Sequence, residues 1–166
     1  MALMRVEKIG SNTFYSCAKL TNVSLPVCSS IGSSAFQNCK SLTSINLPAC
    51  TSIGSTAFRS CSSLSNIDLP LCTNIGSYAF YYCTSLTNIS LPVCSYIGFG
   101  AFSNCTNLSS IYIGTSTVFT IASNVFNRAG ITSTTGSIYV RTSLVDTFKA
   151  TSGWSYFGNR IFGYNF

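Results

Sequence analysis

The chain has 166 residues, of which 46% are apolar and only 7% are charged; nine basic and three acidic side chains give a formal charge of +6. The basic residues are scattered along the chain and form no run, which argues against nucleic-acid binding. Every apolar run is interrupted well before the ~18 consecutive residues of a membrane span, so we expect no membrane insertion.

One phrase returns five times at a constant spacing, beginning with Ile-Gly, continuing through Phe, Cys, Leu, Ile and Leu, and in four copies closing with Pro. A unit this short cannot bury its apolar side chains except against its neighbours, so the period, which is the interval from Ile9 to Ile31, predicts a stack of similar rungs. We assign this array to residues 1–114. Its isoleucine anchors are Ile9, Ile31, Ile53, Ile75 and Ile97, and one cysteine follows in each unit, at Cys17, Cys39, Cys61, Cys83 and Cys105.

The third unit shows the expected local structure. Ile67 and Leu69 alternate with Asn66 and Asp68, which predicts a short strand with one face in the core, and such strands stack into a parallel sheet. Pro70 follows at a corner, because proline cannot donate to a sheet. We place the glycine after each isoleucine at a second corner, in a backbone conformation that a side chain would resist. Between these corners, Ala-Phe-x-x-Cys has the spacing of one α-helical or 3₁₀ turn.

The phrase I-G-S-S-A-F-Q-N-C-K-S-L-T-S-I-N-L-P, from Ile31 to Pro48, resembles the leucine-rich repeats of BspA-like bacterial surface proteins, which also occur in some parasitic protists. The resemblance covers residues 9–114, although the family pattern is usually one residue longer between proline and the next Ile-Gly. It implies an α/β repeat solenoid: a right-handed leucine-rich-repeat coil with a parallel sheet of short strands on one face, short helical or 3₁₀ turns opposite, and a small C-terminal cap that contains α-helix.

The nine cysteines recur at half the repeat period and form two ladders, the second comprising Cys28, Cys50, Cys72 and Cys94. Rungs ~4.8 Å apart hold equivalent Cβ atoms farther apart than the ~3.8 Å that a disulfide prefers. The chain has no histidine and no Cys-x-x-Cys pair, so zinc-ligand spacing is missing. We expect buried, reduced thiols and no metal or cofactor; a disulfide or a metal site is the alternative.

The repeat pattern ends after Ile113. Residues 115–141 are predicted to form an irregular last rung whose strand is Ile138-Tyr139-Val140. Residues 142–166 are expected to form the C-terminal cap, with a helix starting near Ser143 and an aromatic tail around Trp154 that covers the last rung and its open sheet edge. The alternative for the Trp154 cluster is a sugar-stacking platform. Residues 138–161 also resemble a closing segment that follows such repeats in proteins of gut Firmicutes and their phages.

Catalysis is not expected from this composition. The only carboxylates are Glu7, Asp68 and Asp146, which are far apart in sequence, and a cysteine nucleophile would lack its histidine. A single glycine at each corner does not make a phosphate-binding loop. We therefore expect a binding protein rather than an enzyme.

Two surfaces are candidates for binding. The first gathers aromatic residues that we expect to point outward, because isoleucine, phenylalanine, cysteine and leucine fill the inward positions. The second is the polar outer face of the sheet, which ends with a tyrosine. The alternative for the first surface is that its aromatic residues only pack between repeats. The alternative for the second is that its residues are ordinary solvated strand positions. The first set is Tyr78, Tyr81, Tyr82, Tyr96 and Phe99, and the second includes Asn46, Asn66, Asp68, Asn88 and Tyr112.

The family resemblance implies an extracellular or cell-surface protein of a gut bacterium that adheres to a protein or glycan on host matrix, host cells or other microbes. No secretory signal is visible, and one hypothesis is that the chain is a fragment of a longer protein that carries its signal and anchor elsewhere. A phage or prophage structural component and an architectural spacer without a ligand are the two rival interpretations.

Overall fold

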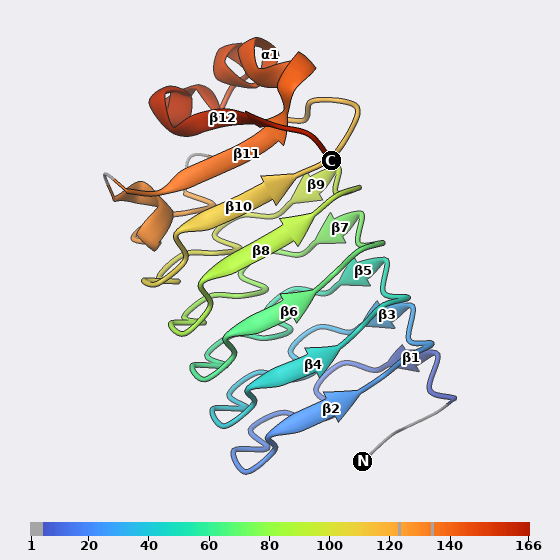
Figure 1. Cartoon of the computed structure of the whole chain (residues 1–166). Coiled ribbons are helices and arrows are strands. Elements are labelled where there is room, and N and C mark those ends of the chain that lie inside the picture. The colour runs from blue at the N-terminus through green and yellow to red at the C-terminus, as the bar shows by residue number, and fades with distance from the viewer. Residues whose placement is uncertain (1–4, 123, 134) are drawn as a thin grey trace.

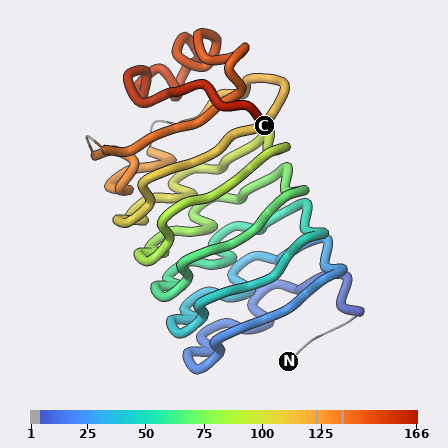
Figure 2. Tube along the Cα trace, in the orientation of Figure 1, coloured from blue at the N-terminus to red at the C-terminus, as the bar shows by residue number. Residues whose placement is uncertain are grey.

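The rungs stack along one axis from the N-terminal end to a helical C-terminal end (Figures 1 and 2). The structure is a computed structural model that describes residues 5–122, 124–133 and 135–166. Apolar side chains of each rung point inward and form one continuous core along the stack. The fold is therefore the repeat solenoid that the period predicts.

A seven-stranded parallel sheet forms one long face, in the order β12-β11-β10-β8-β6-β4-β2 (Figure 1). Equivalent residues of neighbouring rungs are paired, as Ile45 with Ile67 and Ile111 with Ile138. The predicted strand at Ile138-Tyr139-Val140 is confirmed. The strands are β2 (Asn22–Ser24), β4 (Ser44–Asn46), β6 (Asn66–Asp68), β8 (Asn88–Leu91), β10 (Ser110–Ile113), β11 (Ser137–Arg141) and β12 (Ile161–Tyr164).

A second parallel sheet, in the order β1-β3-β5-β7-β9, was not anticipated from the sequence. Each of its strands is very short and ends on the isoleucine that we placed next to a corner. That isoleucine is buried, while the residue before it is half-buried or exposed. The strands are β1 (Lys8–Ile9), β3 (Ser30–Ile31), β5 (Ser52–Ile53), β7 (Asn74–Ile75) and β9 (Tyr96–Ile97).

Consecutive β-turns, rather than α- or 3₁₀-helix, occupy the side of each repeat that carries Ala-Phe-x-x-Cys. In the second repeat the N–H of Ala35 donates to the carbonyl of Gly32 within the rung (3.3 Å), whereas the N–H of Phe36 donates to the carbonyl of Ala57 in the next rung (2.8 Å). A left-handed residue, Ser34 at φ 56°, makes this alternation possible. The turns thereby give part of their N–H groups to the neighbouring rung, which a helix could not do.

The glycine after each isoleucine is required by close approach between rungs, not by its backbone conformation. Among the glycines of the described residues, only Gly100 and Gly153 have a positive φ. A Cβ built on Gly54 would instead lie 2.7 Å from the carbonyl carbon of Gly32 in the rung below. The predicted second corner is present, but our conformational reason for its glycine was wrong.

The core contains a column of phenylalanine rings and two columns of thiols. Successive rings stack with centroids 5.0–5.6 Å apart from Phe14 to Phe126. Eight of the nine cysteines are buried as expected, but Cys17 is exposed, because its rung has a described neighbour on one side only. The buried thiols find backbone acceptors; for example, the Sγ of Cys61 donates to the carbonyl of Phe36 at 3.0 Å.

The C-terminal segment closes the stack. Trp154 has no exposed surface, its Nε1 donates to the carbonyl of Phe119 (2.6 Å), and its ring packs edge-on against Phe148. A fully buried ring cannot stack on a sugar, so Trp154 itself is excluded from the sugar-stacking alternative, while Tyr156, Phe162 and Tyr164 of the same tail are exposed. The chain also adds the strand β12 beside β11, so β12 forms the C-terminal edge of the sheet. The helical elements are η1 (Gly130–Thr132), η2 (Thr142–Leu144), α1 (Val145–Ala150) and η3 (Ser155–Arg160).

Candidate binding surface

The carboxylates lie on separate parts of the fold. Glu7 precedes β1, Asp68 is on β6 and Asp146 is in α1. Within residues 5–122, 124–133 and 135–166, no three His, Cys, Asp or Glu residues gather as a metal ion would require. The same residues contain no helix with the length and hydropathy to span a membrane.

The buried thiols are weak nucleophiles. Burial raises the pKa of Cys39 to about 11 and that of Cys105 to about 12, because the thiolate loses its hydration in the core. Burial also raises the pKa of Cys83, which lies between Cys61 and Cys105 in its ladder. At neutral pH these groups remain protonated, and the thiolate is the reactive form.

Four aromatic side chains meet on the turn side of the solenoid, and we name them the tyrosine patch: Tyr78, Tyr81, Tyr82 and Phe99. The ring of Tyr81 lies 4.6 Å from Tyr82 and 5.5 Å from Tyr78, and Tyr78 lies 5.4 Å from Phe99, between centroids. All three contacts are edge-to-face, at interplanar angles of 82°, 87° and 68°. Tyr78, Tyr82 and Phe99 are at least partly open to solvent, and Tyr81 is half-buried.

A basic residue that was not selected from the sequence packs against the tyrosine patch. The guanidinium carbon of Arg59 lies 5.2 Å from the ring centroid of Tyr81, within cation–π range. Arg59 and Tyr81 occupy the same repeat position in adjacent rungs, one period apart, so the period itself could have indicated the contact.

The fifth aromatic residue of the predicted set lies apart from the other four. Tyr96 is on β9 of the second sheet, with 51% of its side chain exposed. In the described part of the chain it makes no aromatic contact with the patch. The structure therefore brings together Tyr78, Tyr81, Tyr82 and Phe99, but not Tyr96.

Two tyrosines of the patch occupy left-handed backbone positions. Tyr78 has φ 56° and Tyr82 has φ 60°. A left-handed conformation costs a residue with a side chain roughly 1–2 kcal/mol, and less for Asn. The other repeats place small or polar residues at the same two positions: Asn12, Ser34, Thr56 and Gly100 at the first, and Ser16, Asn38, Ser60 and Asn104 at the second.

The ring of Tyr78 lies against Gly100 of the next rung. A Cβ on Gly100 would stand 2.6 Å from Cε1 of Tyr78, so a larger residue would force the ring to shift from this position. Gly100 occupies the repeat position of Tyr78 itself, one period later. The tyrosine ring of one rung and the glycine of the next, which has no side chain, thus fit together across the rung interface.

The predicted sheet face is divided in the structure. Asn46, Asn66 and Asp68 line an open depression of about 430 Å³ at the N-terminal end of the sheet. Asn88 lies on the next strand, β8, where its Nδ2 donates to Oγ1 of Thr87 (3.2 Å). The remaining member, Tyr112 on β10, belongs to a different group of residues.

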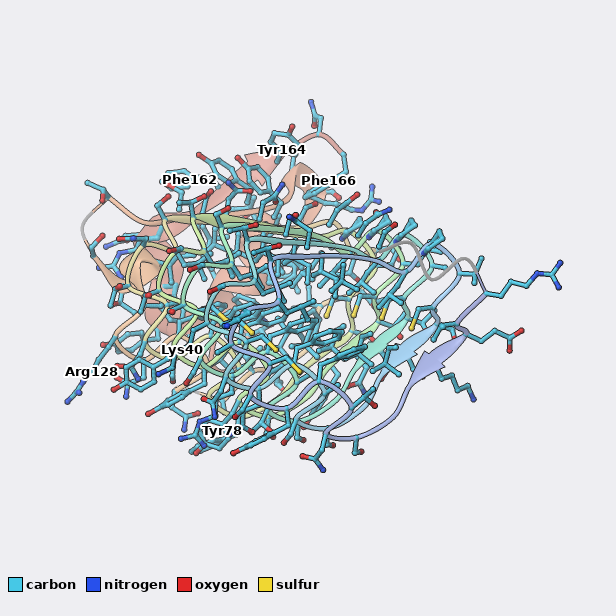
Figure 3. The ribbon with its side chains drawn as sticks, turned by 90° about the horizontal axis from the view of Figure 1, so that it is seen from below. Lys40, Tyr78, Arg128, Phe162, Tyr164 and Phe166 are labelled. Carbon is cyan, nitrogen blue, oxygen red and sulfur yellow. The ribbon has the colours of Figure 1, made fainter. Side chains whose placement is uncertain are left out.

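Aromatic side chains cover the C-terminal end of the same sheet; the sequence placed only Tyr112 on this face and assigned Phe162, Tyr164 and Phe166 to the cap. The ring of Tyr112 stacks on Tyr139 with centroids 4.7 Å apart and planes inclined by 13°, and strand pairing places Phe162 beside Tyr139. Figure 3 shows Phe162, Tyr164 and Phe166 on one side of the molecule and Tyr78 on the opposite side. The C-terminal aromatic cluster comprises Tyr112, Tyr139, Phe162, Tyr164 and Phe166.

Comparisons with known proteins agree with this architecture. The family model described as "BspA type Leucine rich repeat region (6 copies)" matches residues 7–132. The structure is similar to the T. pallidum leucine-rich-repeat protein TpLRR, with 36% identity, a TM-score of 0.63, and coverage of 66% of this chain and 53% of that one. A leucine-rich-repeat protein from Bacteroides ovatus ATCC 8483 shows 30% identity and a TM-score of 0.58 over 64% of this chain and 35% of that one.

The pneumococcal vaccine antigen PcpA has the same fold over nearly the whole chain. It aligns with 98% of this chain and 42% of its own, with a TM-score of 0.67 and 18% identity. No curated protein matches the sequence. The chain spans about half the length of TpLRR and about a third of the B. ovatus protein. Since the family model covers most of its residues, this chain belongs to the BspA-type leucine-rich-repeat family.

Proposed function

We propose that this chain is a binding domain of a bacterial cell-surface or secreted protein, and that the tyrosine patch is its contact site. The observation that carries the proposal is the presence of tyrosines at two left-handed positions where other repeats have small or polar residues. An unfavourable backbone conformation kept at a surface position suggests a requirement other than stability. Contiguous exposed aromatic side chains also anchor many recognition surfaces.

Adhesion to a host matrix, a host cell or another microbe is the biological role that family membership supports. The role needs no catalysis, and the separation of the three carboxylates and the high pKa of the buried thiols agree with a non-enzymatic domain. A leucine-rich-repeat scaffold presents side chains at fixed intervals along a rigid stack, which suits recognition of a large partner.

Equilibrium binding of the immobilised domain to matrix proteins, mucin glycans and bacterial surfaces tests the proposal. The decisive variant replaces Tyr78, Tyr81 and Tyr82 with serine, and Tyr96→Ser is the matched control outside the patch. We expect saturable binding that the triple variant loses and the control retains. Equal binding by the two variants would remove the tyrosine patch as the site.

The polar depression on the sheet is a second candidate site. Its observation is the open volume of about 430 Å³ lined by amide, hydroxyl and carboxylate groups, with Asp68 the only charged residue among them. The variant Asn66→Ser/Asp68→Ser distinguishes it, because it changes the depression and leaves the patch intact. Binding lost only in this variant would place the site on the sheet, and no binding by the wild-type domain would favour the phage-structural or spacer interpretation.

A further inference from the structure

The tyrosine patch contains no stacked pair of rings, whereas the C-terminal aromatic cluster contains one beside three edge-to-face contacts. On the sheet, Tyr112 and Tyr139 are nearly parallel at 4.7 Å, so each covers a face of the other. In the patch all three pairs are edge-to-face, and half of the Phe99 side chain is exposed. In an edge-to-face contact only one of the two rings has a face covered by the other, and the negative face of an aromatic ring attracts partially positive C–H groups. The patch therefore offers faces on which a saturated ring can stack.

The charge around the patch is positive. Residues 10–20, 32–42, 54–64, 76–86 and 98–108, which form the turn sides of the five repeats, contain Lys19, Lys40 and Arg59 and no carboxylate. Figure 3 places Lys40 and Tyr78 on the same side of the molecule. The nearest of these cations is Arg59, whose side chain is exposed and packs on Tyr81. Its planar guanidinium can pair with a carboxylate through two parallel hydrogen bonds.

Small hydroxyl and amide groups flank the rings. Thr56 is the neighbour of Tyr78 in the preceding rung, and its Oγ1 lies 2.8 Å from the Oγ of Ser34. Ser60 and Asn104 stand on either side of Tyr82 in its column and are half-buried. These groups can exchange hydrogen bonds with hydroxyl groups of a ligand.

We infer that the tyrosine patch binds an acidic polysaccharide, with a sugar ring stacked on Tyr82 or Phe99 and a sugar carboxylate paired with Arg59. The inference rests on the proposed function, since it names the ligand class of the same site. A sugar acid combines the three features that the patch matches: an apolar C–H face, several hydroxyl groups and one negative charge. An acidic peptide matches the charge but supplies no saturated ring to stack, so it is the comparison in the test.

The test measures binding of oligogalacturonate by calorimetry and by ring-proton shifts in NMR, beside the neutral galactose oligomer of equal length and a glutamate peptide of equal charge. Two variants are compared with the wild-type domain: Arg59→Gln, and the double variant Tyr82→Asn/Phe99→Ser. Each introduced residue already occurs at the same position of a neighbouring repeat, as Gln37, Asn104 and Ser77 respectively. Tyr112→Ser on the sheet is the control.

We expect the wild-type domain to bind oligogalacturonate about tenfold more tightly than the neutral oligomer, because hydrogen bonds to a charged group are stronger than neutral ones. Arg59→Gln should abolish that difference. The double variant Tyr82→Asn/Phe99→Ser should bind neither oligomer, and the control Tyr112→Ser should bind both as the wild type does. Equal binding of the glutamate peptide, or sugar binding unaffected by the ring variant, would overturn the inference. If the sugars fail while the serine triple variant still abolishes binding to another partner, the ligand class is wrong and the proposed function stands.

Discussion

Gly54 lies directly above Gly32, and the two backbones touch. A Cβ on Gly54 would be 2.7 Å from the carbonyl carbon of Gly32 and 2.9 Å from the carbonyl oxygen of Ile31. The same close approach recurs at Gly32, Gly76 and Gly98. Gly10, in the first rung, has only the Thr13 hydroxyl oxygen nearby, at 3.4 Å.

This difference predicts unequal effects of one substitution at two equivalent positions. Gly54→Ala should lower the free energy of unfolding by about 1–3 kcal/mol, because backbone atoms of the rung below must move. Gly10→Ala should leave it unchanged or raise it by about 0.4–1 kcal/mol, since it restricts the unfolded chain. Urea unfolding of both variants measures the two values, and equal destabilisation would contradict the role of rung contact.

Tyr82→Asn should stabilise the fold while it removes part of the patch. Asn tolerates the left-handed conformation better than Tyr, and Asn38 and Asn104 already occupy this position. We expect a gain of about 0.5–1 kcal/mol, or a rise in Tm of about 1–4 °C for a chain of this size. Tyr81→Gln is the control, because Tyr81 has no positive φ and should show no gain. A lower Tm for Tyr82→Asn would mean that ring packing outweighs backbone strain.

The native protein should show two classes of thiol. Cys17 is exposed, whereas the other eight cysteines are buried in the core. Titration of protein prepared without reductant should give one thiol that reacts at once and eight that react only after unfolding. Cys17→Ala should remove the fast phase alone. Fewer than nine thiols under denaturant would indicate disulfides and contradict the reduced ladders.

Alkaline pH should destabilise the fold. The buried thiols have a higher pKa in the folded protein than the ordinary value of 9.0, about 11 for Cys39 and about 12 for Cys105. Between pH 9 and these values the unfolded chain loses protons that the folded chain retains, so stability falls as pH rises. Each such thiol contributes a slope of about 1.4 kcal/mol per pH unit in this window.

Cys105→Ala isolates one of these contributions. The variant is less stable at every pH because it leaves a cavity, so the informative quantity is the slope of unfolding free energy between about pH 9 and pH 11. That slope should become shallower than in the wild type, as followed by urea unfolding at each pH. An unchanged slope would show that this thiol does not contribute to the alkaline loss of stability.

The C-terminal segment should depend on one indole ring. Trp154→Ala should lower the free energy of unfolding by about 3–5 kcal/mol, because the ring is fully buried against Phe126 and Phe148. Tyr156→Ala, at a position 74% exposed, is the control and should change it by less than about 0.5 kcal/mol. Hydrogen exchange should show the loss of protection in Ser137–Arg141 first. Equal effects of the two substitutions would contradict the role of Trp154.

The repeat period determined most of the fold without a structure. Identical spacing makes every inter-rung neighbour the residue one period away, so stacked strands, buried phenylalanines and cysteine ladders follow from counting. The same counting applied to Tyr81 leads to Arg59. The second sheet was missed because its very short strands leave no alternation to detect.

The tertiary structure decided the contacts between residues that are not one repeat period apart. Tyr112 pairs with Tyr139, which is farther along the chain than one period, and Tyr139 pairs with Phe162 after the chain has passed through α1 and η3. Neither offset follows from the repeat, because it depends on the path of an irregular rung and a cap. The left-handed turns are likewise tertiary, since the N–H groups they free are satisfied only by the next rung. The sequence alone determined which side chains of the inner rungs face the core, because burial there follows periodicity, whereas only the folded chain decided which rings of the C-terminal aromatic cluster meet.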